Sequence, residues 1–338
     1  MSNIVVILGP ITPESATPRQ ESQDAAERVG GIDLRFVDDS LPFDEIVEQS
    51  QGAVMILPKV RTDILVDLVS KLGTVKLVQT SSAGTDWIDK ATLAEMGVDV
   101  ANNGGANAVA VAEHAIGLMF STNRKLDVQI ESVKAGTWMQ GVEGERGEFH
   151  TLVGKRIGIV GLGRIGSRVA KRLAGWECEL VYHDVIDHPA DYVAATGAKR
   201  VSFDELVSTC DIITLHVPQD RVTTHMMSDR EFEMMKPTGI LINTCRGPVV
   251  DENALIRALE SKEIFAAGLD VITDGEQSRF DFNLSFYAFI SGIDMETRSN
   301  RLWGPPAHDQ RGKHQIISEL DVPNGFGAIR EFDRFHFK

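Results

Sequence analysis

Three glycines are spaced as a nucleotide-binding turn requires. Gly161, Gly163 and Gly166 form the pattern G-x-G-x-x-G, after the apolar run Arg156–Val160 and at the start of a helical pattern that we expect to open at Arg164. In such a turn the first glycine permits a tight bend, the second lets a diphosphate approach the backbone, and the third lets helix and strand pack closely. The N–H groups at the helix start attract phosphate. The segment therefore predicts a dinucleotide site.

An aspartate ends the next apolar run and points to the kind of dinucleotide. Asp184 follows the strand candidate Glu179–His183, close to the spacing of about 20 residues that is typical of ribose-binding carboxylates. A carboxylate accepts hydrogen bonds from ribose hydroxyls and repels a 2′-phosphate. Neither Arg nor Lys occurs among the next four residues, Val185, Ile186, Asp187 and His188. The sequence therefore predicts NAD rather than NADP.

Residues able to do chemistry follow the later strand candidates of the same region. They are Val217 and Pro218, then Thr244 to Gly247, and finally Asp270. In an open parallel sheet, ligands bind outside the carboxyl ends of the strands, so these segments should share one site. Arg246 is the strongest candidate, because a guanidinium can grip a carboxylate and oppose the charge that grows on a carbonyl oxygen during reduction.

Other polar residues near this edge have a structural interpretation that we favour. His114 lies in an apolar helical run, where a histidine satisfied at an interface is the ordinary case. His216 fits a strand histidine, with a role near the cofactor as the alternative. Cys245 fits a small residue in a tight turn, since a redox role would need a thiolate stabilised by Arg246.

Strand and helix patterns alternate in two blocks, which indicates an α/β protein with parallel sheets. An amphipathic helix is expected over Asp63–Lys71, and an almost uniformly apolar one over Asn107–Ser121, which should be buried on most sides at a domain or subunit boundary. The alternation stops near Thr273, and nothing after it indicates a fold. The expected strands are Ile4–Leu8, Leu34–Val37, Ala53–Leu57, Lys76–Thr80 and Val98–Ala101, then Arg156–Val160, Glu179–His183, Ile212–His216, Gly239–Asn243 and Ile264–Leu269.

Composition narrows the class of protein and of partner. The chain has 338 residues, 43% hydrophobic and 25% charged, which suits a globular protein of two domains. Its net charge of −15 disfavours nucleic acid and anionic membranes as partners. We recognise neither a signal peptide nor a membrane helix. Three widely spaced cysteines form neither a disulfide framework nor a metal pattern, which predicts a cytoplasmic protein without a metal site.

Five strings resemble the D-isomer-specific 2-hydroxyacid dehydrogenases, a family that includes phosphoglycerate, glyoxylate and hydroxypyruvate reductases. In chain order they are SSAGTDWIDKATLAEMGVDVANNGGANAVAVAEHAIGLM, GKRIGIVGLGRIGSRVAKRL, LHVP, MKPTGILINTCRGPVVDENALIRAL and AAGLDV. The resemblance covers most of residues 1–271. It implies a doubly wound Rossmann NAD-binding domain, residues 105–290, inserted into a flavodoxin-like substrate domain, residues 1–104. A divergent tail, residues 291–338, would return to the substrate domain.

The resemblance also implies roles for individual residues. Arg164 and Ile165 would contact the pyrophosphate and Asp184 the adenosine ribose, while Thr244 to Arg246 and Asp270 would surround the nicotinamide. Arg246 would bind the carboxylate or carbonyl oxygen of a small 2-hydroxy or 2-oxo acid. Backbone at Ala83 and Gly84 would approach the substrate. A homodimer through the apolar helix is a further implication.

One departure from the family pattern concerns the proton. Hydride transfer to a carbonyl needs an acid/base group, and the family supplies it from a Pro-His pair, supported by an acidic residue before a proline. The corresponding sequence here is GLDVITDGEQSRF, which lacks the proline. Glu276 and His308 are the candidates, although each also fits a solvated loop residue. Two alternatives follow: an NAD-binding regulatory protein without catalysis, or a chain that folds poorly without the customary C-terminal segment.

Overall fold

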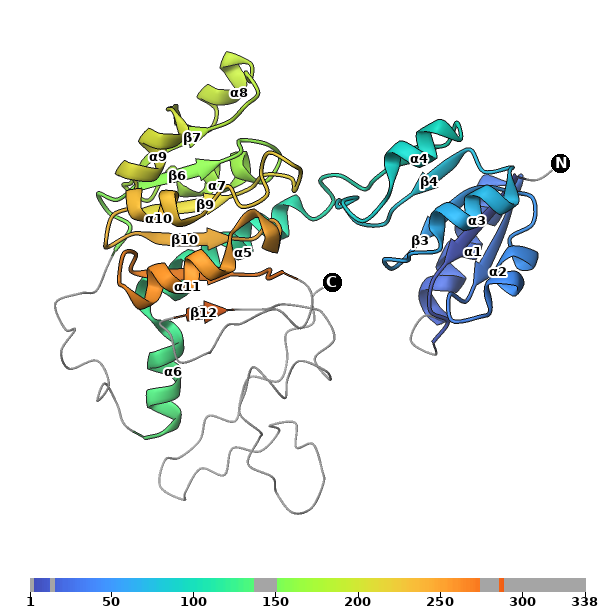
Figure 1. Cartoon of the computed structure of the whole chain (residues 1–338), viewed down its shortest axis with the longest axis horizontal. Helices are drawn as coiled ribbons and strands as arrows, with labels where there is room; N and C mark the ends of the chain where they lie inside the picture. Colours follow the sequence, from blue (N-terminus) through green and yellow to red (C-terminus); the bar gives the residue numbers. More distant parts are fainter. Residues whose placement is uncertain (1–2, 13–15, 137–150, 274–285, 289–338) are drawn as a thin grey trace, which may run out of the picture. The chain divides into compact units, whose positions relative to one another are not determined.

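The computed structural model describes residues 3–12, 16–136, 151–273 and 286–288 (Figure 1). Its first sheet has five parallel strands in the order β2-β1-β3-β4-β5. This is the flavodoxin-like order, in which the chain turns back between β1 and β3. The strands are β1 (Asn3–Leu8), β2 (Ile32–Val37), β3 (Ala53–Pro58), β4 (Leu77–Gln79) and β5 (Asp99–Ala101).

Crossover helices cover this sheet and bury its apolar strands. Leu65, Leu68, Val69 and Leu72 recur at helical spacing and form the buried face of one of them, α3, which the sequence predicted over Asp63–Lys71. The side chain of Asp89 accepts a hydrogen bond from the Thr92 N–H and so begins α4. The helices are α1 (Ala16–Val29), α2 (Phe43–Gln49), α3 (Leu65–Leu72) and α4 (Lys90–Glu95).

The second sheet has seven parallel strands in the order β12-β11-β10-β9-β6-β7-β8, with the reversal between β6 and β9. This is the doubly wound order of a Rossmann sheet. Buried on both faces, its central strands are continuous apolar runs. They are β6 (Arg156–Val160), β7 (Glu179–His183), β8 (Lys199–Arg200), β9 (Ile212–Leu215), β10 (Ile240–Asn243), β11 (Ala266–Leu269) and β12 (Phe286–Ala288).

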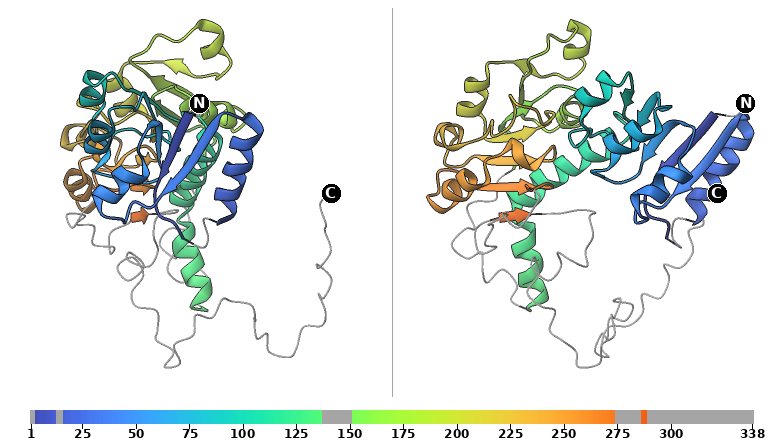
Figure 2. Two further views of the ribbon diagram at one scale, coloured as in Figure 1. Left: turned by 90° about the vertical axis from the view of Figure 1, so that its right-hand side faces the viewer. Right: turned by 45° about the vertical axis from the view of Figure 1, so that its right-hand side comes forward.

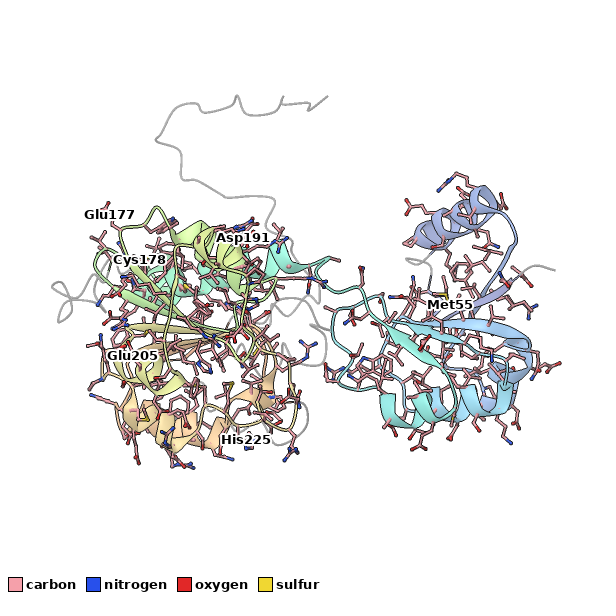
Figure 3. The ribbon with its side chains drawn as sticks, turned by 90° about the horizontal axis from the view of Figure 1, so that it is seen from above. Met55, Glu177, Cys178, Asp191, Glu205 and His225 are labelled. Carbon is pink, nitrogen blue, oxygen red and sulfur yellow. The ribbon has the colours of Figure 1, made fainter. Side chains whose placement is uncertain are left out.

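Helices cover both faces of the second sheet (Figures 1 and 2). One core cluster joins the sheet to α9, α10 and α11, and the other joins it to α5 and α7. Figure 3 shows the side chains of both sheets, with Met55 on β3 and Glu205 on α9. The helices of this part are α5 (Ala108–Arg124), α6 (Leu126–Lys134), α7 (Gly166–Leu173), α8 (Ala190–Ala194), α9 (Phe203–Thr209), α10 (Asp229–Met234) and α11 (Glu252–Glu260), with a short 3₁₀ turn at Gly247–Val249.

Local sequence signals place the starts of three of these helices. Ser202 accepts a hydrogen bond from the Glu205 N–H at the start of α9. Asp251 caps α11 through the Ala254 N–H. At α10, Ser228 and Glu231 form a reciprocal capping box. Each such cap stabilises a helix by about 1 kcal/mol.

The long helix α5 packs one face against β10, β11 and α7, while the opposite face is exposed in the single chain. Residues at helical spacing, such as Ala112, Ala115 and Met119, reach the core. Val109 on the opposite face is 46% exposed. Burial of that second face at a subunit boundary stays a prediction.

All ten predicted strands are confirmed, with ends shifted by up to two residues. The sequence missed β8, which is only two charged residues long, and β12, which lies where the pattern had stopped. Helix α7 begins at Gly166 rather than at Arg164. The domain boundaries at 104 and 290 stay a prediction, and the tail 291–338 lies outside the described residues. In the part of the chain that is described, no helix has the length and hydropathy to cross a membrane.

Candidate functional site

The glycine-rich turn between β6 and α7 has the geometry that its spacing predicts. Gly161 has a φ of +90°, and a Cβ there would lie 2.6 Å from the carbonyl oxygen of His216. A Cβ on Gly166 would overlap the carbonyl group of Gly161. A Cβ on Gly163 would have no atom of the described residues within 4 Å, apart from its chain neighbours. The tight bend and the close helix packing are therefore confirmed, and the space beside Gly163 is open.

Hydrogen bonds within the protein hold the first residues of this turn and two of its carbonyl groups. The N–H of Leu162 donates to Oδ2 of Asp184 at 2.7 Å, and the Tyr192 hydroxyl lies 3.0 and 3.1 Å from the carbonyl oxygens of Leu162 and Gly163. Tyr192 comes from α8, and nothing in the sequence pattern had singled it out. The carbonyl side of the turn is thus engaged within the protein.

The amide side of the same turn is unengaged. Among the described residues, the backbone N–H groups of Gly163, Arg164 and Ile165 make no hydrogen bond. Neighbouring N–H groups at a helix start form a concave site for an anion. The side chain of Arg164 lies against Gly104 and Gly105, where a Cβ would collide with it. The turn therefore offers unpaired donors and open space to the same ligand, as a diphosphate requires.

Asp184 lies at the carboxyl end of β7 with its side chain only 10% exposed. Besides Leu162, it accepts hydrogen bonds from the Ile186 N–H at 2.9 Å and from Nε2 of His188 at 3.0 Å. Burial of the carboxyl acts to raise its pKa, but the hydrogen bonds from His188 and from the two backbone amides outweigh burial and lower the pKa. The group is therefore a carboxylate at neutral pH.

A cation that the sequence did not reveal lies beside Asp184. Arg200, from β8, donates to the backbone carbonyl of Asp184 at 2.7 Å and forms an ion pair with Asp187. The prediction of NAD over NADP rests on the four residues after Asp184, and Arg200 follows much later in the chain. The strand pairing of β7 with β8 brings it back to this position.

The loop after β10 is organised by a buried asparagine. Oδ1 of Asn243 accepts a hydrogen bond from the Cys245 N–H at 3.0 Å, while Nδ2 donates to the carbonyl of Arg246 at 2.9 Å. The carbonyl of Asn243 also accepts the N–H of Asp270 at 2.9 Å. Asn243 is 1% exposed. Its side chain and backbone therefore connect the two segments that the sequence placed at one sheet edge, and no sequence signal had identified it.

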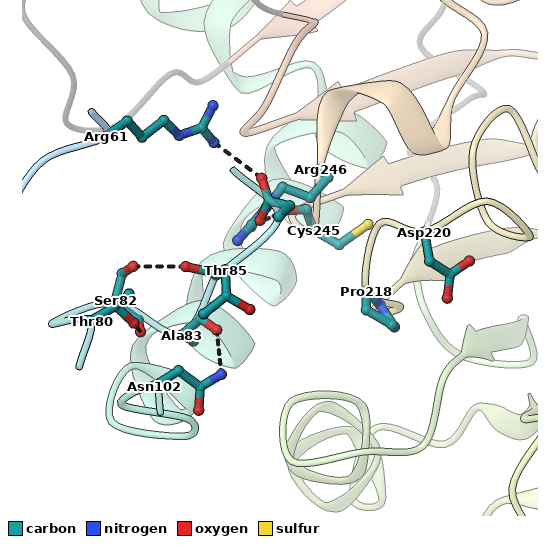
Figure 4. A network of polar contacts seen from close by, with 12 residues as sticks. Arg61, Thr80, Ser82, Ala83, Thr85, Asn102, Pro218, Asp220, Cys245 and Arg246 are labelled. Carbon is teal, nitrogen blue, oxygen red and sulfur yellow. Dashed lines mark hydrogen bonds and ion pairs between the residues drawn. The ribbon is translucent and has the colours of Figure 1, made fainter. Parts of the chain in front are cut away.

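The Arg246 guanidinium is one third exposed and is held on two sides (Figure 4). Nη1 donates to the Cys245 carbonyl at 2.6 Å, and Nε donates to Oδ1 of Asp86 at 3.0 Å. A Cβ on Gly84 would collide with this guanidinium, which explains the glycine there. The carboxylate of Asp86 also lies 3.4 Å from Nη2 of Arg61. One carboxylate therefore faces two guanidiniums.

Asp86 was not predicted as part of the site. Burial of its carboxyl acts to raise the pKa, but the hydrogen bond and charge of Arg246 outweigh burial, and the pKa lies below its usual value. Ala83, on the same loop, accepts a hydrogen bond from Nδ2 of Asn102 at 2.7 Å. The predicted backbone at Ala83 and Gly84 is thus fixed by Asn102, and Gly84 meets Arg246.

Two buried polar atoms at the carboxyl edge of the second sheet have no hydrogen-bond partner among the described residues. They are Oγ1 of Thr244 and Nδ1 of His216. Burial lowers the pKa of His216 to about 3. An imidazole with that pKa is a poor proton acceptor near neutral pH, which argues against His216 as the acid/base group. The Thr244 hydroxyl remains available to a ligand.

Cys245 cannot act as the redox group that its position beside Arg246 had allowed. Its side chain is buried, and burial raises the pKa of the thiol to about 11 despite the nearby charge of Arg246. A thiol with this pKa is protonated at neutral pH and unreactive.

Val217 and Pro218 lie on the loop after β9 (Figure 4). Cγ1 of Val217 would lie 3.2 Å from a Cβ added to Gly161. These residues line the edge by packing.

Two predicted catalytic residues, Glu276 and His308, lie outside the described residues. In the described ranges, no three side chains of His, Cys, Asp or Glu gather as metal ligands would. The remaining predicted residues gather along the carboxyl edge of the second sheet or, for Ala83 and Gly84, on the loop that meets Arg246. Open space at Gly163, unpaired amides and the unpartnered Thr244 hydroxyl fit a dinucleotide.

Comparison with known proteins gives an independent view of this edge. Residues 116–285 match the model of the "D-isomer specific 2-hydroxyacid dehydrogenase, NAD binding domain". The chain is similar to D-3-phosphoglycerate dehydrogenase 3, chloroplastic, of Arabidopsis thaliana, 40% identical over 204 residues, which cover 60% of this chain and 34% of that protein. It is similar to the glyoxylate reductase of Thermococcus litoralis, 36% identical, covering 65% of this chain and 70% of the relative.

A solved structure is similar over both sheets. The D-lactate dehydrogenase of Aquifex aeolicus, complexed with NAD and lactic acid, superposes with a TM-score of 0.68 at 29% identity, covering 80% of this chain and 77% of that one. By contrast, the chain spans only about a third to a half of the D-3-phosphoglycerate dehydrogenases that it matches.

The open space at Gly163 yields a paired test. Gly163→Ala should fold normally, because its Cβ meets no protein atom, but should weaken NADH binding about tenfold or more, because the methyl group fills the space a diphosphate needs. Gly166→Ala should instead lower the melting temperature, because its Cβ overlaps the Gly161 carbonyl. Thermal melting and fluorescence titration with NADH measure both. If Gly163→Ala bound NADH as tightly as wild type, the diphosphate could not bind at this turn.

Proposed function

We propose that this chain, which belongs to the D-isomer specific 2-hydroxyacid dehydrogenase family, is an NAD-dependent oxidoreductase acting on the CH–OH group of a small 2-hydroxy acid, or reducing the 2-oxo acid. The observation that carries the proposal is the position of Arg246. The loop organised by Asn243 holds this residue at the same sheet edge as the glycine-rich turn. The names of the relatives support acids of this class.

In this proposal the chain binds NAD along the carboxyl edge of the second sheet. The amides of Gly163 to Ile165 bind the diphosphate, and Asp184 binds the adenosine ribose. Val217, Pro218, Thr244, Cys245 and Asp270 line the remainder of the cofactor site. When bound, NADH supplies the hydride. Asp184 favours NAD over NADP, because its charge repels a 2′-phosphate.

Arg246 binds the carboxylate of the acid and opposes the charge developing on its carbonyl oxygen. The backbone at Ala83 and Gly84 closes on the substrate from the other side. We propose that His308 is the acid/base group that donates or accepts the proton, and that the carboxylate of Glu276 supports this histidine. Replacing His308 by Ala tests this assignment, because unchanged turnover would remove His308 from the mechanism.

A second candidate function is an NAD-binding regulatory protein without catalysis. It is favoured by one observation: the sequence GLDVITDGEQSRF lacks the acidic residue before a proline that accompanies the family's acid/base histidine. Tight NADH binding without turnover of glyoxylate, hydroxypyruvate or phosphohydroxypyruvate would support this second function over the first.

The substrate role of Arg246 predicts a graded loss of activity. We expect Arg246→Ala to lower kcat/KM for the best of those three acids by about 10²–10³-fold, as for other groups that stabilise developing negative charge. Arg246→Lys should recover only part, because an ammonium cannot form the bidentate contact. NADH oxidation at 340 nm measures both.

A matched control separates this loss from an effect of charge. Arg257 forms a surface ion pair with Asp229, and Arg257→Ala should leave kcat/KM within about twofold. Equal losses in the Arg246 and Arg257 variants would contradict a substrate contact at Arg246.

Cofactor choice tests Asp184. We expect Asp184→Asn to weaken NADH binding and to shift the NADPH to NADH affinity ratio at least about tenfold toward NADPH, because it removes a negative charge beside Arg200 and His188. Since hydrogen bonds lower the pKa of Asp184, wild-type preference for NADH should persist as pH falls to about 5 and be lost only below the usual carboxyl pKa. Asp191→Asn, the same charge change on α8 (Figure 3), serves as the control and should leave the ratio unchanged.

The proposal includes a homodimer through the exposed face of α5. Val109 is 46% exposed there, and a hollow of about 350 Å³ lined by Phe120, Val153 and Trp176 lies at the C-terminal end of the same helix. A sedimentation mass of one chain would contradict the dimer.

A cytoplasmic location is also proposed, supported by three free cysteines, Cys178, Cys210 and Cys245.

A further inference from the structure

We propose that His114 on α5 is a positioning residue, which orients the carboxylate of Asp270 toward the nicotinamide half of the cofactor. This inference rests on the proposed function, since it requires a dinucleotide at the carboxyl edge of the second sheet. Neither the family pattern nor the sequence analysis gave His114 this role, and a satisfied interface histidine was the prediction.

The strand order places Asp270 on the nicotinamide side. A dinucleotide lies across the point where the strand order reverses, which here is between β6 and β9. Asp184, at the end of β7, marks the half of the sheet that takes the adenosine ribose. The nicotinamide must then lie over the ends of β9, β10 and β11. Asp270 directly follows β11, and its N–H is bonded to the carbonyl of Asn243 at the end of β10.

The crossing of α5 over β11 brings His114 to this carboxylate. Gly268 lets the helix approach the strand, because a Cβ there would lie 2.7 Å from Oγ1 of Thr122 and 3.4 Å from Cβ of Leu118. His114 precedes Leu118 by four residues and so lies one turn earlier on the same helix face. Asp270 follows Gly268 by two residues and so lies on the same face of the strand. The two side chains therefore meet.

The contact is specific but incomplete. Nε2 of His114 lies 3.3 Å from Oδ1 of Asp270, an ion-pair distance, yet it makes no hydrogen bond of good geometry among the described residues and is covered from solvent. The two side chains remain 27% and 19% exposed, so neither is locked inside the core. A carboxylate only accepts hydrogen bonds, so Nε2 must carry the proton between them.

The chemistry of the nicotinamide matches such a carboxylate. Its carboxamide carries an NH₂ group that donates hydrogen bonds, and a carboxylate has about four acceptor positions, of which His114 faces one oxygen only. By contacting that oxygen, His114 restricts the orientation of the Asp270 carboxylate. An orienting partner of this kind commonly sets the geometry of a ligand-binding side chain.

The test compares two ligands that differ in the nicotinamide. Calorimetric titration of the full chain with NADH and with ADP-ribose, which lacks the nicotinamide, separates its two ends. We expect His114→Leu to weaken NADH about tenfold, as for the loss of one hydrogen bond to a charged group, and to leave ADP-ribose within about twofold. In turnover, KM for NADH should rise more than kcat falls.

Matched variants distinguish positioning from packing. His114→Gln keeps an N–H donor and should recover NADH affinity to within about threefold of wild type. Glu113→Gln alters the neighbouring residue, which pairs with Arg172 away from Asp270, and should change neither ligand. Asp270→Asn should lower NADH affinity selectively, and adding His114→Leu to it should have little further effect.

Several outcomes would overturn the proposal. NADH affinity unchanged in His114→Leu would show that the contact orients nothing, and equal losses for both ligands would show that the histidine only supports the fold. If His114→Leu does not melt cooperatively, the Gln and Asp270 variants decide the question on the same criterion. Failure of the wild-type chain to bind either ligand would instead refute the proposed function.

Discussion

Close backbone contact between Gly161 and Gly166 is the constraint on which the rest of the second sheet depends. Because neither residue has a Cβ, the start of α7 can lie directly against the end of β6, with the β9 end alongside. That approach leaves three amides of the turn without partners in the described part of the chain and holds Asp184 within reach of the Leu162 N–H. The neighbouring strand ends then form one continuous edge, where the residues able to do chemistry collect.

The polar residues along this edge are held in place by uncharged side chains that take no part in the proposed reaction. Asn243 fixes the loop that carries Arg246, Tyr192 fixes the carbonyl side of the glycine turn, and Asn102 fixes Ala83. Each of these hydrogen bonds joins a side chain to backbone, which restrains the loop without consuming the reactive group. Amides and a phenol therefore hold the loops of the site in place.

Much of this could be predicted from the sequence, because strand periodicity and the glycine spacing are local signals. All ten expected strands and both packing roles of the glycines are confirmed. Two of the residues that were missed, Arg200 and Asp86, owe their importance to neighbours distant in sequence. Arg200 reaches Asp184 only through strand pairing, and Asp86 meets Arg246 across 160 positions of the chain. Local patterns contain no information about such contacts. Asn243 was missed although its side chain binds Cys245 and Arg246 close by in the sequence, because a polar residue at a strand end has no pattern that singles it out.

The hydrogen bonds that Asp184 makes within the protein have a consequence for how this site can change over generations. Two backbone amides and His188 already bind its carboxylate before any nucleotide arrives. In the proposed function the same side chain would both maintain the shape of the turn and discriminate between NAD and NADP. A mutation that merely relaxes discrimination also loosens the turn, so descendants that adopt a different nucleotide must first acquire a substitute tether for Leu162. Such a requirement for two changes in order slows drift between cofactors, even though a suitable cation already lies nearby.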